Sequence, residues 1–280
     1  MAMTNTALNN AFSSAQNRVI AVTSGKGGVG KTNFSANLAI ALARFRKRVL
    51  LVEGDLSLAN VDVLLGLQAP FNLHHVLTGK KTLRDIIIEH SSGVKIVPAS
   101  SGVEEMSDLS EDQLETFFNE LRTLDQEADI TIIDTAAGMS DNVRQFLTAA
   151  PEIVLVTTPE PTSITDGYAM TKVIARRKIN PNIHLMVNMA RNEEEAASTA
   201  RAIGTAAQEF LKVSFNHLGY IPQDANVGLA ARQQQPFILS HPQSPASLHL
   251  LAMARILLNV QEEQGNLESY FRQVSGNGEE

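Results

Sequence analysis

A glycine-rich segment, residues 25–32, has the residue types and spacing needed to bind a nucleoside triphosphate. It reads GKGGVGKT, fits the pattern G-x-x-x-x-G-K-S/T, and lies between an apolar run at 19–22 and a helical pattern that begins near residue 32. Small residues let the backbone turn tightly, so that successive N–H groups and a helix N-terminus face the phosphates. Lys31 would reach the β- and γ-phosphates, and the Thr32 hydroxyl would bind Mg²⁺. The expected nucleotide contacts are Gly27, Gly28, Val29, Gly30, Lys31, Thr32 and Asn33.

The second residue of this loop, Lys26, is not needed to bind phosphate within one subunit. Spacing alone leaves two interpretations open. Lys26 is either a solvated loop charge or a group that reaches a second nucleotide.

Acidic residues follow two other apolar runs. Glu53 and Asp55 come directly after 49–52, and because they are two positions apart on an extended chain, both can face the same pocket. The alternative is a solvated acidic turn. Asp134 follows the run 130–133 and is succeeded by small residues, as expected for a strand-terminal carboxylate aimed at a metal. By itself such an aspartate is more often a helix cap, but the phosphate loop reverses that preference.

Asn188 ends a further apolar run, 183–187. Its amide can offer both an acceptor and a donor to the edge of a purine ring. The alternative is a turn residue that bonds its own backbone.

The elements that must position these residues alternate along the chain. Apolar runs predict strands at 19–22, 49–52, 94–97, 130–133, 153–157, 183–187 and 213–218, and helical patterns fall at 32–45, 83–89, 110–124, 143–149, 163–178, 193–211 and 245–262. Ser110 and Gln113 form the pattern of a capping box. Continuously apolar strands alternating with helices predict a doubly wound α/β fold, a mostly parallel sheet with helices on both faces. Ligands of such sheets bind beyond the carboxyl ends of the strands, where the candidate residues lie.

Composition limits the class of protein. The chain has 280 residues, 44% of them hydrophobic, and is long enough to form one large α/β domain or two smaller ones. We expect one domain, at 18–262, after a polar extension at 1–17. A net charge of −7 argues against a surface built for nucleic acid, so no direct nucleic-acid partner is expected. The absence of cysteine excludes disulfides and thiolate chemistry. With no signal peptide and no membrane-spanning run visible, we expect a cytoplasmic protein.

Segment 24–32 resembles the deviant Walker A loop of the MinD/ParA ATPases. In that family the early lysine crosses a nucleotide-sandwiched homodimer, so the resemblance implies that Lys26 acts in trans and Lys31 in cis. Segment 53–62 resembles the family's switch I, which implies that Asp55 aligns the attacking water and contributes to the Mg²⁺ site. Glu53 stands where the family usually has aspartate, and its longer side chain suggests altered surroundings for Mg²⁺. Segment 159–166, PEPTSITD, resembles a family segment near the dimer face, with a structural role.

The same resemblance assigns the remaining site residues. It implies that the N–H of Gly138 senses the γ-phosphate, that Asn188 recognises adenine, and that the loop at Pro222 packs on the base. Together with Asp134, which binds the metal through water, these residues imply Mg-ATP as the ligand and slow, regulatory hydrolysis.

Within this family the chain looks most like the flagellar-number regulators FlhG and FleN, on segments 60–66, 82–85, 94–102 and 134–138. The resemblance implies a dimerising switch that binds a sigma-54-type transcriptional activator and limits flagellar number. The FlhF GTPase is a further partner of such proteins, but residues 1–17 lack the D-Q-A-x-x-L-R motif that stimulates it. A positioning ATPase of the MinD or ParA kind is the main alternative, and a metabolic phosphotransferase is a weaker one.

An apolar stripe in segment 263–280 is formed by Leu267, Tyr270, Phe271 and Val274. Family members often end in a membrane-targeting helix, but such helices favour a basic polar face, and Arg272 is the single basic residue after Gln264. We therefore favour docking of this segment on protein over binding to the inner face of the cell membrane.

Overall fold

A single sheet organises the molecule. The computed structural model describes residues 17–56, 59–99, 109–176 and 182–259. Within these ranges eight strands form one sheet in the order β3-β4-β2-β5-β1-β6-β7-β8. Neighbouring strands run parallel except β3 and β4, which pair antiparallel. The strands are β1 (Arg18–Thr23), β2 (Val49–Gly54), β3 (Ile88–Glu89), β4 (Lys95–Val97), β5 (Ile130–Thr135), β6 (Glu152–Thr157), β7 (Asn182–Ala190) and β8 (Asn216–Pro222).

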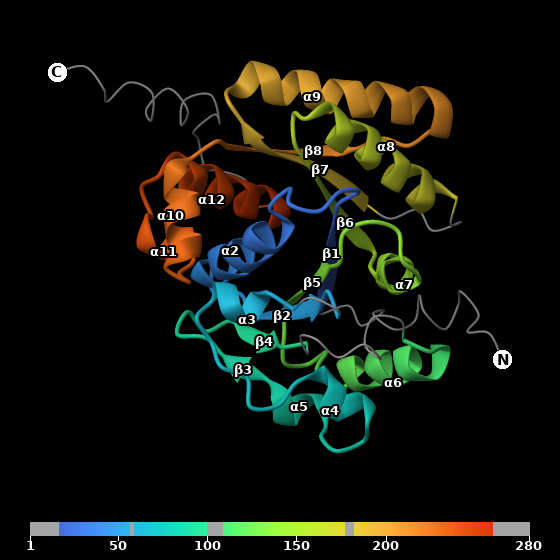
Figure 1. Ribbon diagram of the computed structural model, residues 1–280, viewed down its shortest axis with the longest axis vertical. Helices are drawn as coiled ribbons and strands as arrows, with labels where there is room; N and C mark the ends of the chain where they lie inside the picture. Colours follow the sequence, from blue (N-terminus) through green and yellow to red (C-terminus); the bar gives the residue numbers. More distant parts are fainter. Residues whose placement is uncertain (1–16, 57–58, 100–108, 177–181, 260–280) are drawn as a thin grey trace.

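Helices cover both faces of this sheet (Figure 1). One layer holds α2 (Lys31–Arg44), α3 (Val61–Leu64), α10 (Ala225–Arg232), α11 (Phe237–Ser240) and α12 (Pro245–Leu257). The other holds α4 (Leu73–Leu77), α5 (Leu83–Ile86), α6 (Glu111–Arg122), α7 (Asp141–Ala149), α8 (Pro161–Ala175) and α9 (Glu193–Ala206), which continues into the π-helical turn η3 (Ala207–Leu211). The predicted doubly wound α/β fold is therefore confirmed.

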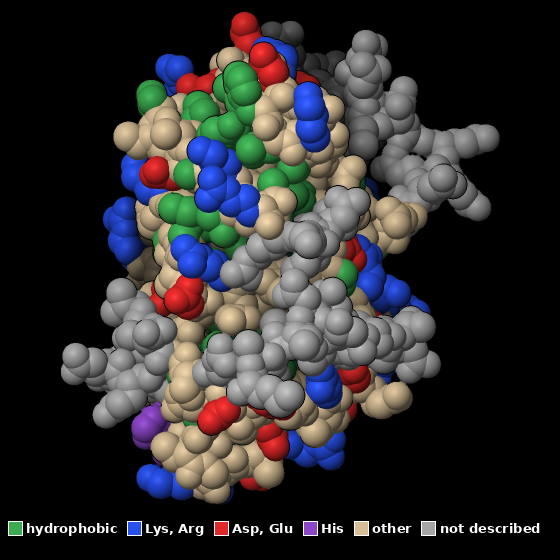
Figure 2. Space-filling model, turned by 90° about the vertical axis from the view of Figure 1, so that its right-hand side faces the viewer, with side chains coloured by type: hydrophobic (Ala, Val, Ile, Leu, Met, Phe, Trp, Pro, Cys, Tyr) green, Lys and Arg blue, Asp and Glu red, His purple; other side chains and the backbone are tan. Residues whose placement is uncertain are grey.

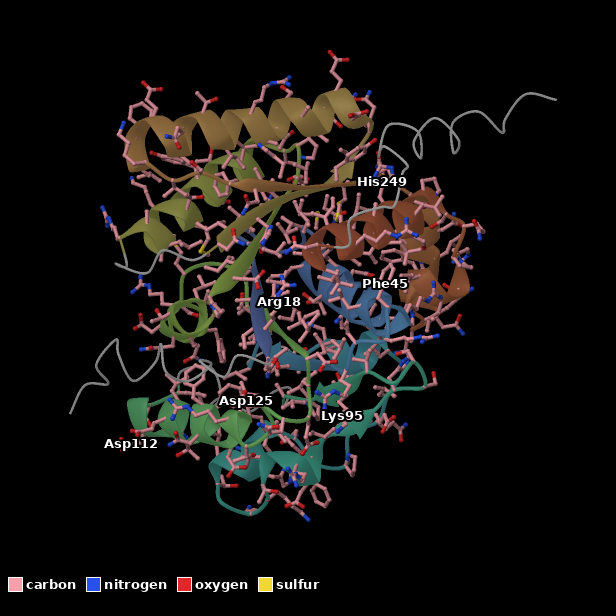
Figure 3. The ribbon with its side chains drawn as sticks, turned by 180° about the vertical axis from the view of Figure 1, so that it is seen from behind. Arg18, Phe45, Lys95, Asp112, Asp125 and His249 are labelled. Carbon is pink, nitrogen blue, oxygen red and sulfur yellow. The ribbon has the colours of Figure 1, made fainter. Side chains whose placement is uncertain are left out.

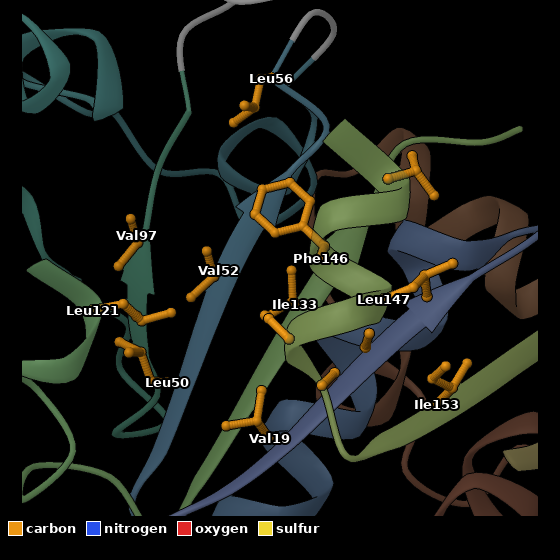
Figure 4. Close-up of a cluster of buried hydrophobic side chains, with 14 of the residues drawn as sticks. Val19, Leu50, Val52, Leu56, Val97, Leu121, Ile133, Phe146, Leu147 and Ile153 are labelled. Carbon is orange, nitrogen blue, oxygen red and sulfur yellow. The ribbon is translucent and has the colours of Figure 1, made fainter. Parts of the chain in front are cut away.

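The core separates into two clusters, one on each face of the sheet. On the α6 and α7 side, Phe117, Phe118 and Phe146 pack edge to face with ring centroids 5.4–6.0 Å apart. Phe146 lies over the side chains of Val52 and Ile133 on adjacent strands (Figure 4). Burying this apolar surface on both faces holds the strand ends rigidly, and the strand ends carry the candidate site.

A polar cluster lies at the amino ends of the strands, on the side of the sheet opposite the candidate site. Arg18 lies at the start of β1 (Figure 3). It donates to both carboxylate oxygens of Glu152 at 2.8 and 2.7 Å and to the Leu257 carbonyl at the end of α12. Burial alone would raise the pKa of Glu152, but the neighbouring His184 and Arg18 lower it to about 2. His184 Nε2 lies 3.6 Å from Glu152, too far for a hydrogen bond. Arg18 is therefore the partner that ties β1, β6 and α12 together.

Three of the predicted elements were wrong in part. The helix predicted at 245–262 ends at Leu257. The segment 83–89 is helical only to Ile86, and Ile88–Glu89 instead pairs with β4, because Ile87 is extended and its β-branched neighbours favour a strand. The strand predicted at 213–218 begins at Asn216, since α9 and η3 continue to Leu211 and the chain turns at Lys212. The capping box of Ser110 and Gln113 is confirmed.

The two terminal segments predicted from the sequence, 1–17 and 263–280, lie largely outside the described residues. The apolar stripe of segment 263–280 is not among them, and neither are residues 1–16. Asn17, assigned to the polar extension, is buried and bonds Thr131 of β5 and Asp125, so it packs with the domain.

Candidate nucleotide-binding site

The glycine-rich segment forms a loop between β1 and α2. Gly28 and Gly30 have φ of +79° and +87°, a left-handed backbone that glycine adopts without steric cost. Gly30 is the N-cap of α2, so the loop leads directly into a helix N-terminus. Lys31, the first residue of α2, is 8% exposed. The predicted nucleotide contacts at residues 27–32 thus share one compact loop.

Two positions of this loop have no room for a side chain, because other atoms lie close to the backbone. A Cβ on Gly25 would collide with the backbone carbonyl of Asp166 on α8, and a Cβ on Gly30 would collide with the Asn188 side-chain nitrogen. That nitrogen donates a 2.7 Å hydrogen bond to the Val29 carbonyl. Asn188, 8% exposed, therefore lies at the loop and supports its backbone directly, while its contact with adenine stays a prediction.

Asp134 lies at the end of β5, beside the phosphate loop. Strand register sets Val22 of β1 on one side of it and Glu53 of β2 on the other. Its Oδ1 accepts a 2.8 Å hydrogen bond from Ser35 of α2, while Oδ2 is buried and, within the described part of the chain, has no hydrogen-bond partner. Burial raises the pKa of Asp134, opposed by the charge of Lys31. An unpartnered buried carboxylate oxygen at this position suits water bound to a metal.

Glu53 takes a different position from the one its sequence context suggested. It is 1% exposed and accepts backbone N–H groups from Asp55 at 3.2 Å, Asn60 at 2.9 Å and Val61 at 2.8 Å. Burial, with the nearby charge of Asp134, raises the pKa of Glu53 to about 8. The side chain therefore anchors both ends of the segment that carries Asp55.

The number of protein oxygens available at the site suits Mg²⁺ bound together with a nucleotide. Among the residues that the structure describes, no group of three acidic or histidine side chains could hold a metal by itself. Mg²⁺ in nucleotide sites is bound by one or two protein oxygens, with waters and phosphates completing the octahedron. The Thr32 hydroxyl would provide one such oxygen, and the unpartnered Oδ2 of Asp134 would bond a metal-bound water; the charge of Asp55 acts on Asp134.

Lys26 has partners within its own chain. Its Nζ lies 2.6 Å from Glu160 Oε2 and 3.0 Å from Thr162 Oγ1. Pro159 and Pro161 flank Glu160, and Pro161 begins α8. The segment 159–166 thus holds the lysine at the protein surface, where both charged side chains are more than one third exposed.

Three other predicted contacts lie around the loop. The Gly138 N–H donates to the Ser24 carbonyl at 3.1 Å, so it would have to leave that bond to reach a phosphate. Pro222 pairs with Ala190 at the ends of β8 and β7, beside Asn188. Asn33, in the first turn of α2, accepts a hydrogen bond from Asn37.

Sequence reasoning missed Ser35, Glu160 and Asp166 as neighbours of the site. Ser35 follows Lys31 by one helical turn, a spacing that could have suggested it. Glu160 and Asp166 reach the loop across 134 and more residues, and no local pattern indicates such contacts.

A phosphate loop after β1 and a buried aspartate at the end of β5, in a parallel sheet covered on both faces, define a P-loop nucleotide-binding protein. Residues 15–258 match the ParA family model, described as NUBPL iron-transfer P-loop NTPase. The chain belongs to the ParA family of P-loop NTPases, which bind nucleotide and act as ATPases.

Relatives within the family include flagellar proteins. The chain is 42% identical to the antiactivator FleN of Pseudomonas aeruginosa over 238 residues, covering 85% of each chain. It is 32% identical to the flagellum site-determining protein YlxH of Helicobacter pylori, covering 92% of this chain and 89% of that protein. The predicted resemblance to MinD/ParA-type ATPases and to FleN is confirmed.

Solved structures support the fold. The MinD protein of Pyrococcus horikoshii, complexed with Mg-ADP, has a TM-score of 0.71 at 24% identity, covering 89% of this chain and 100% of that one. The MinC:MinD complex of Aquifex aeolicus gives a TM-score of 0.73 at 24% identity, covering 89% of this chain and 98% of that one.

Among the described helices, none is long and apolar enough to span a membrane.

Proposed function

We propose that this chain is an ATP-dependent, dimerising switch that restrains flagellar gene expression, and so flagellar number, by binding a sigma-54-type transcriptional activator. The observation that carries this proposal is the 42% identity to an antiactivator over 85% of both chains. An alignment of 238 residues extends far beyond the nucleotide site alone.

The nucleotide cycle follows from the residues around the loop. Lys31 would bind the β- and γ-phosphates, and Thr32 would hold Mg²⁺ together with Asp134, which would act through water. Bound Mg²⁺ neutralises charge that develops on the phosphates. Asp55 aligns the attacking water, and its position depends on Glu53, whose carboxylate accepts the Asp55 N–H. Asp55→Ala should therefore abolish turnover while leaving ADP affinity near that of the wild type; unchanged turnover would contradict this role.

Dimerisation would change the partners of Lys26 at the protein surface. Lys26 is proposed to leave Glu160 and cross to the nucleotide of a second copy, so that ATP binding and the loss of one surface ion pair are linked. Exposed ion pairs contribute only about 0–1 kcal/mol, so the Glu160 contact does not prevent this exchange.

Counting flagella in a strain of the source organism that lacks this chain tests the proposal. We expect more flagella per cell in this strain. The wild-type chain should restore the normal number, and so should the control variant Lys212→Ala, which changes an exposed lysine directly after η3. Lys31→Ala should not restore it. Purified activator should also bind the wild-type chain more tightly with ATP than with ADP. Unchanged flagellar number in the deletion strain would overturn the proposal.

A positioning ATPase is the second candidate, favoured by the relationship to a flagellum site-determining protein. It predicts misplaced flagella at normal number, so the same micrographs separate the two functions. Acidic and basic side chains are interspersed over the lower half of the face in Figure 2, which gives that face no single charge suited to a nucleoid. Adding purified FlhF tests the remaining partner; stimulation of its GTPase by this chain would show that the N-terminal motif is dispensable.

A further inference from the structure

Met189 has a backbone conformation that its surroundings do not explain. Five non-glycine residues of the described chain have positive φ: Arg46, Met189, Lys212, Gln234 and Asn259. Four of them lie within two residues of the ends of α2, η3, α10 and α12, where a left-handed residue commonly terminates a helix. Met189, with φ of +58°, lies instead inside β7, where a left-handed methionine is strained.

The strain accompanies a bulge at the carboxyl end of the strand. Asn188 pairs with Ile221 and Ala190 with Pro222, so Met189 is an extra residue between two successive pairs. A bulge of this kind redirects a side chain, and bulges concentrate next to functional sites. Here the redirected side chain leaves the sheet: Met189 is 45% exposed, although its neighbours Asn188 and Ala190 are buried.

The side chain turns toward the phosphate loop. Its terminal methyl carbon lies 3.6 Å from the point where a Cβ on Gly30 would stand. The preceding residue, Asn188, bonds the Val29 carbonyl of the same loop, and the following residue, Ala190, pairs with Pro222 at the end of β8. An exposed thioether therefore lies next to the loop and adjoins Asn188, for which the family resemblance implies a contact with adenine.

We propose that Met189 is a base-contacting residue, whose left-handed bulge places its thioether against the face of the nucleotide's purine ring. This rests on the proposed function, since it names the residue that contacts the base of the same nucleotide. Methionine suits the position because its polarisable sulfur packs favourably against aromatic rings and its flexible side chain adapts to them. A bulge without a ligand would be served better by glycine, which carries no strain at positive φ.

The test compares ligands with and without a base, using the full chain. Isothermal titration should show that Met189→Ala binds ADP about 3- to 10-fold more weakly while tripolyphosphate affinity stays within twofold of the wild type. Met139→Ala is the matched control, because Met139 is equally exposed, at 44%, at the same edge of the sheet. It should bind both ligands like the wild type.

A second pair of variants separates contact from folding. Met189→Gly and Met189→Ala both lack the thioether, so they should bind ADP equally weakly. The glycine variant should nevertheless melt at the higher temperature, because glycine relieves the left-handed strain; at an ordinary strand position the order is reversed.

The inference is overturned if Met189→Ala binds ADP as the wild type does, if it loses ADP and tripolyphosphate to the same extent, or if Met189→Gly melts below Met189→Ala. Lys31→Ala distinguishes this failure from failure of the proposed function. It should lose both ligands, and a Lys31→Ala protein that kept them would show that the nucleotide site itself is wrongly assigned.

Discussion

Replacing Gly30 with alanine should destabilise the nucleotide-free protein more than the same change at Gly28. Both glycines are left-handed, with φ of +87° and +79°. An alanine there costs about 1–2 kcal/mol in either position. The surroundings differ: at Gly28 the space for a Cβ is open, whereas at Gly30 it holds the Asn188 side-chain nitrogen.

The additional cost at Gly30 follows from what Asn188 must give up. Its side chain would turn away and break the 2.7 Å bond to the Val29 carbonyl. Losing that bond costs about 1 kcal/mol, and leaving the amide buried without a partner costs about 1–3 kcal/mol more. Gly30→Ala should therefore lower the free energy of unfolding by about 3–6 kcal/mol, against about 1–2 kcal/mol for Gly28→Ala.

Urea denaturation followed by circular dichroism, without nucleotide, measures these differences. Asn188→Ala removes the obstruction, so on that background Gly30→Ala should cost only the 1–2 kcal/mol of its backbone strain, to within about 0.5 kcal/mol. Equal losses for the two glycine variants, or additive losses in the double variant, would refute the reasoning that the Asn188 amide fills the space beside Gly30.

Three other substitutions test separate parts of the molecule. Lys26→Ala should keep ADP affinity but lose the ATP-dependent dimer in light scattering; a dimer that forms normally contradicts action in trans. Glu53→Ala leaves the N–H groups of Asp55, Asn60 and Val61 without their acceptor, so it should slow ATP hydrolysis about 10-fold or more with a smaller change in ADP affinity. Glu152→Gln should lower the free energy of unfolding by about 3 kcal/mol at pH 7, because the pKa of Glu152 is about 2 rather than 4.5. This contribution is present above pH 4.5 and is lost as the pH falls toward 2, so the difference between the two proteins should shrink to about 2 kcal/mol at pH 3.5 in urea titrations, and a constant difference would contradict the ion-pair account.

The long elements of the fold were predictable because each one is regular over at least four residues and buries a continuous apolar surface. That holds for β1, β2, β5, β6 and β7 and for α2, α6 and α12. The short helices α3, α4, α10 and α11 were missed, since four to eight residues carry too little periodicity to indicate a helix. Their stability comes from tertiary contacts, such as the bond from the Ile238 N–H of α11 to Asn37 of α2.

The gathering of the site could be predicted for a topological reason. Parallel strands have their carboxyl ends on one side of a sheet. The loop after β1, Asp134 near the end of β5 and Asn188 near the end of β7 therefore had to lie on the same side once the fold class was known. The details of contact could not be predicted, because they depend on the packing of residues far apart in sequence. Asp166 beside Gly25 and Glu160 beside Lys26 are both of this kind.

Glu53 shows how a departure from a family pattern acquires a physical role only in three dimensions. From the sequence, its longer side chain suggested an altered environment for Mg²⁺. In the structure the carboxylate instead accepts N–H groups of Asn60 and Val61, seven and eight residues further along the chain, in addition to that of Asp55. A fully buried carboxyl group that accepts three backbone N–H groups fixes the ends of the segment between them. The position of Asp55 therefore depends on Glu53, and the extra methylene is best understood through those hydrogen bonds rather than through the metal.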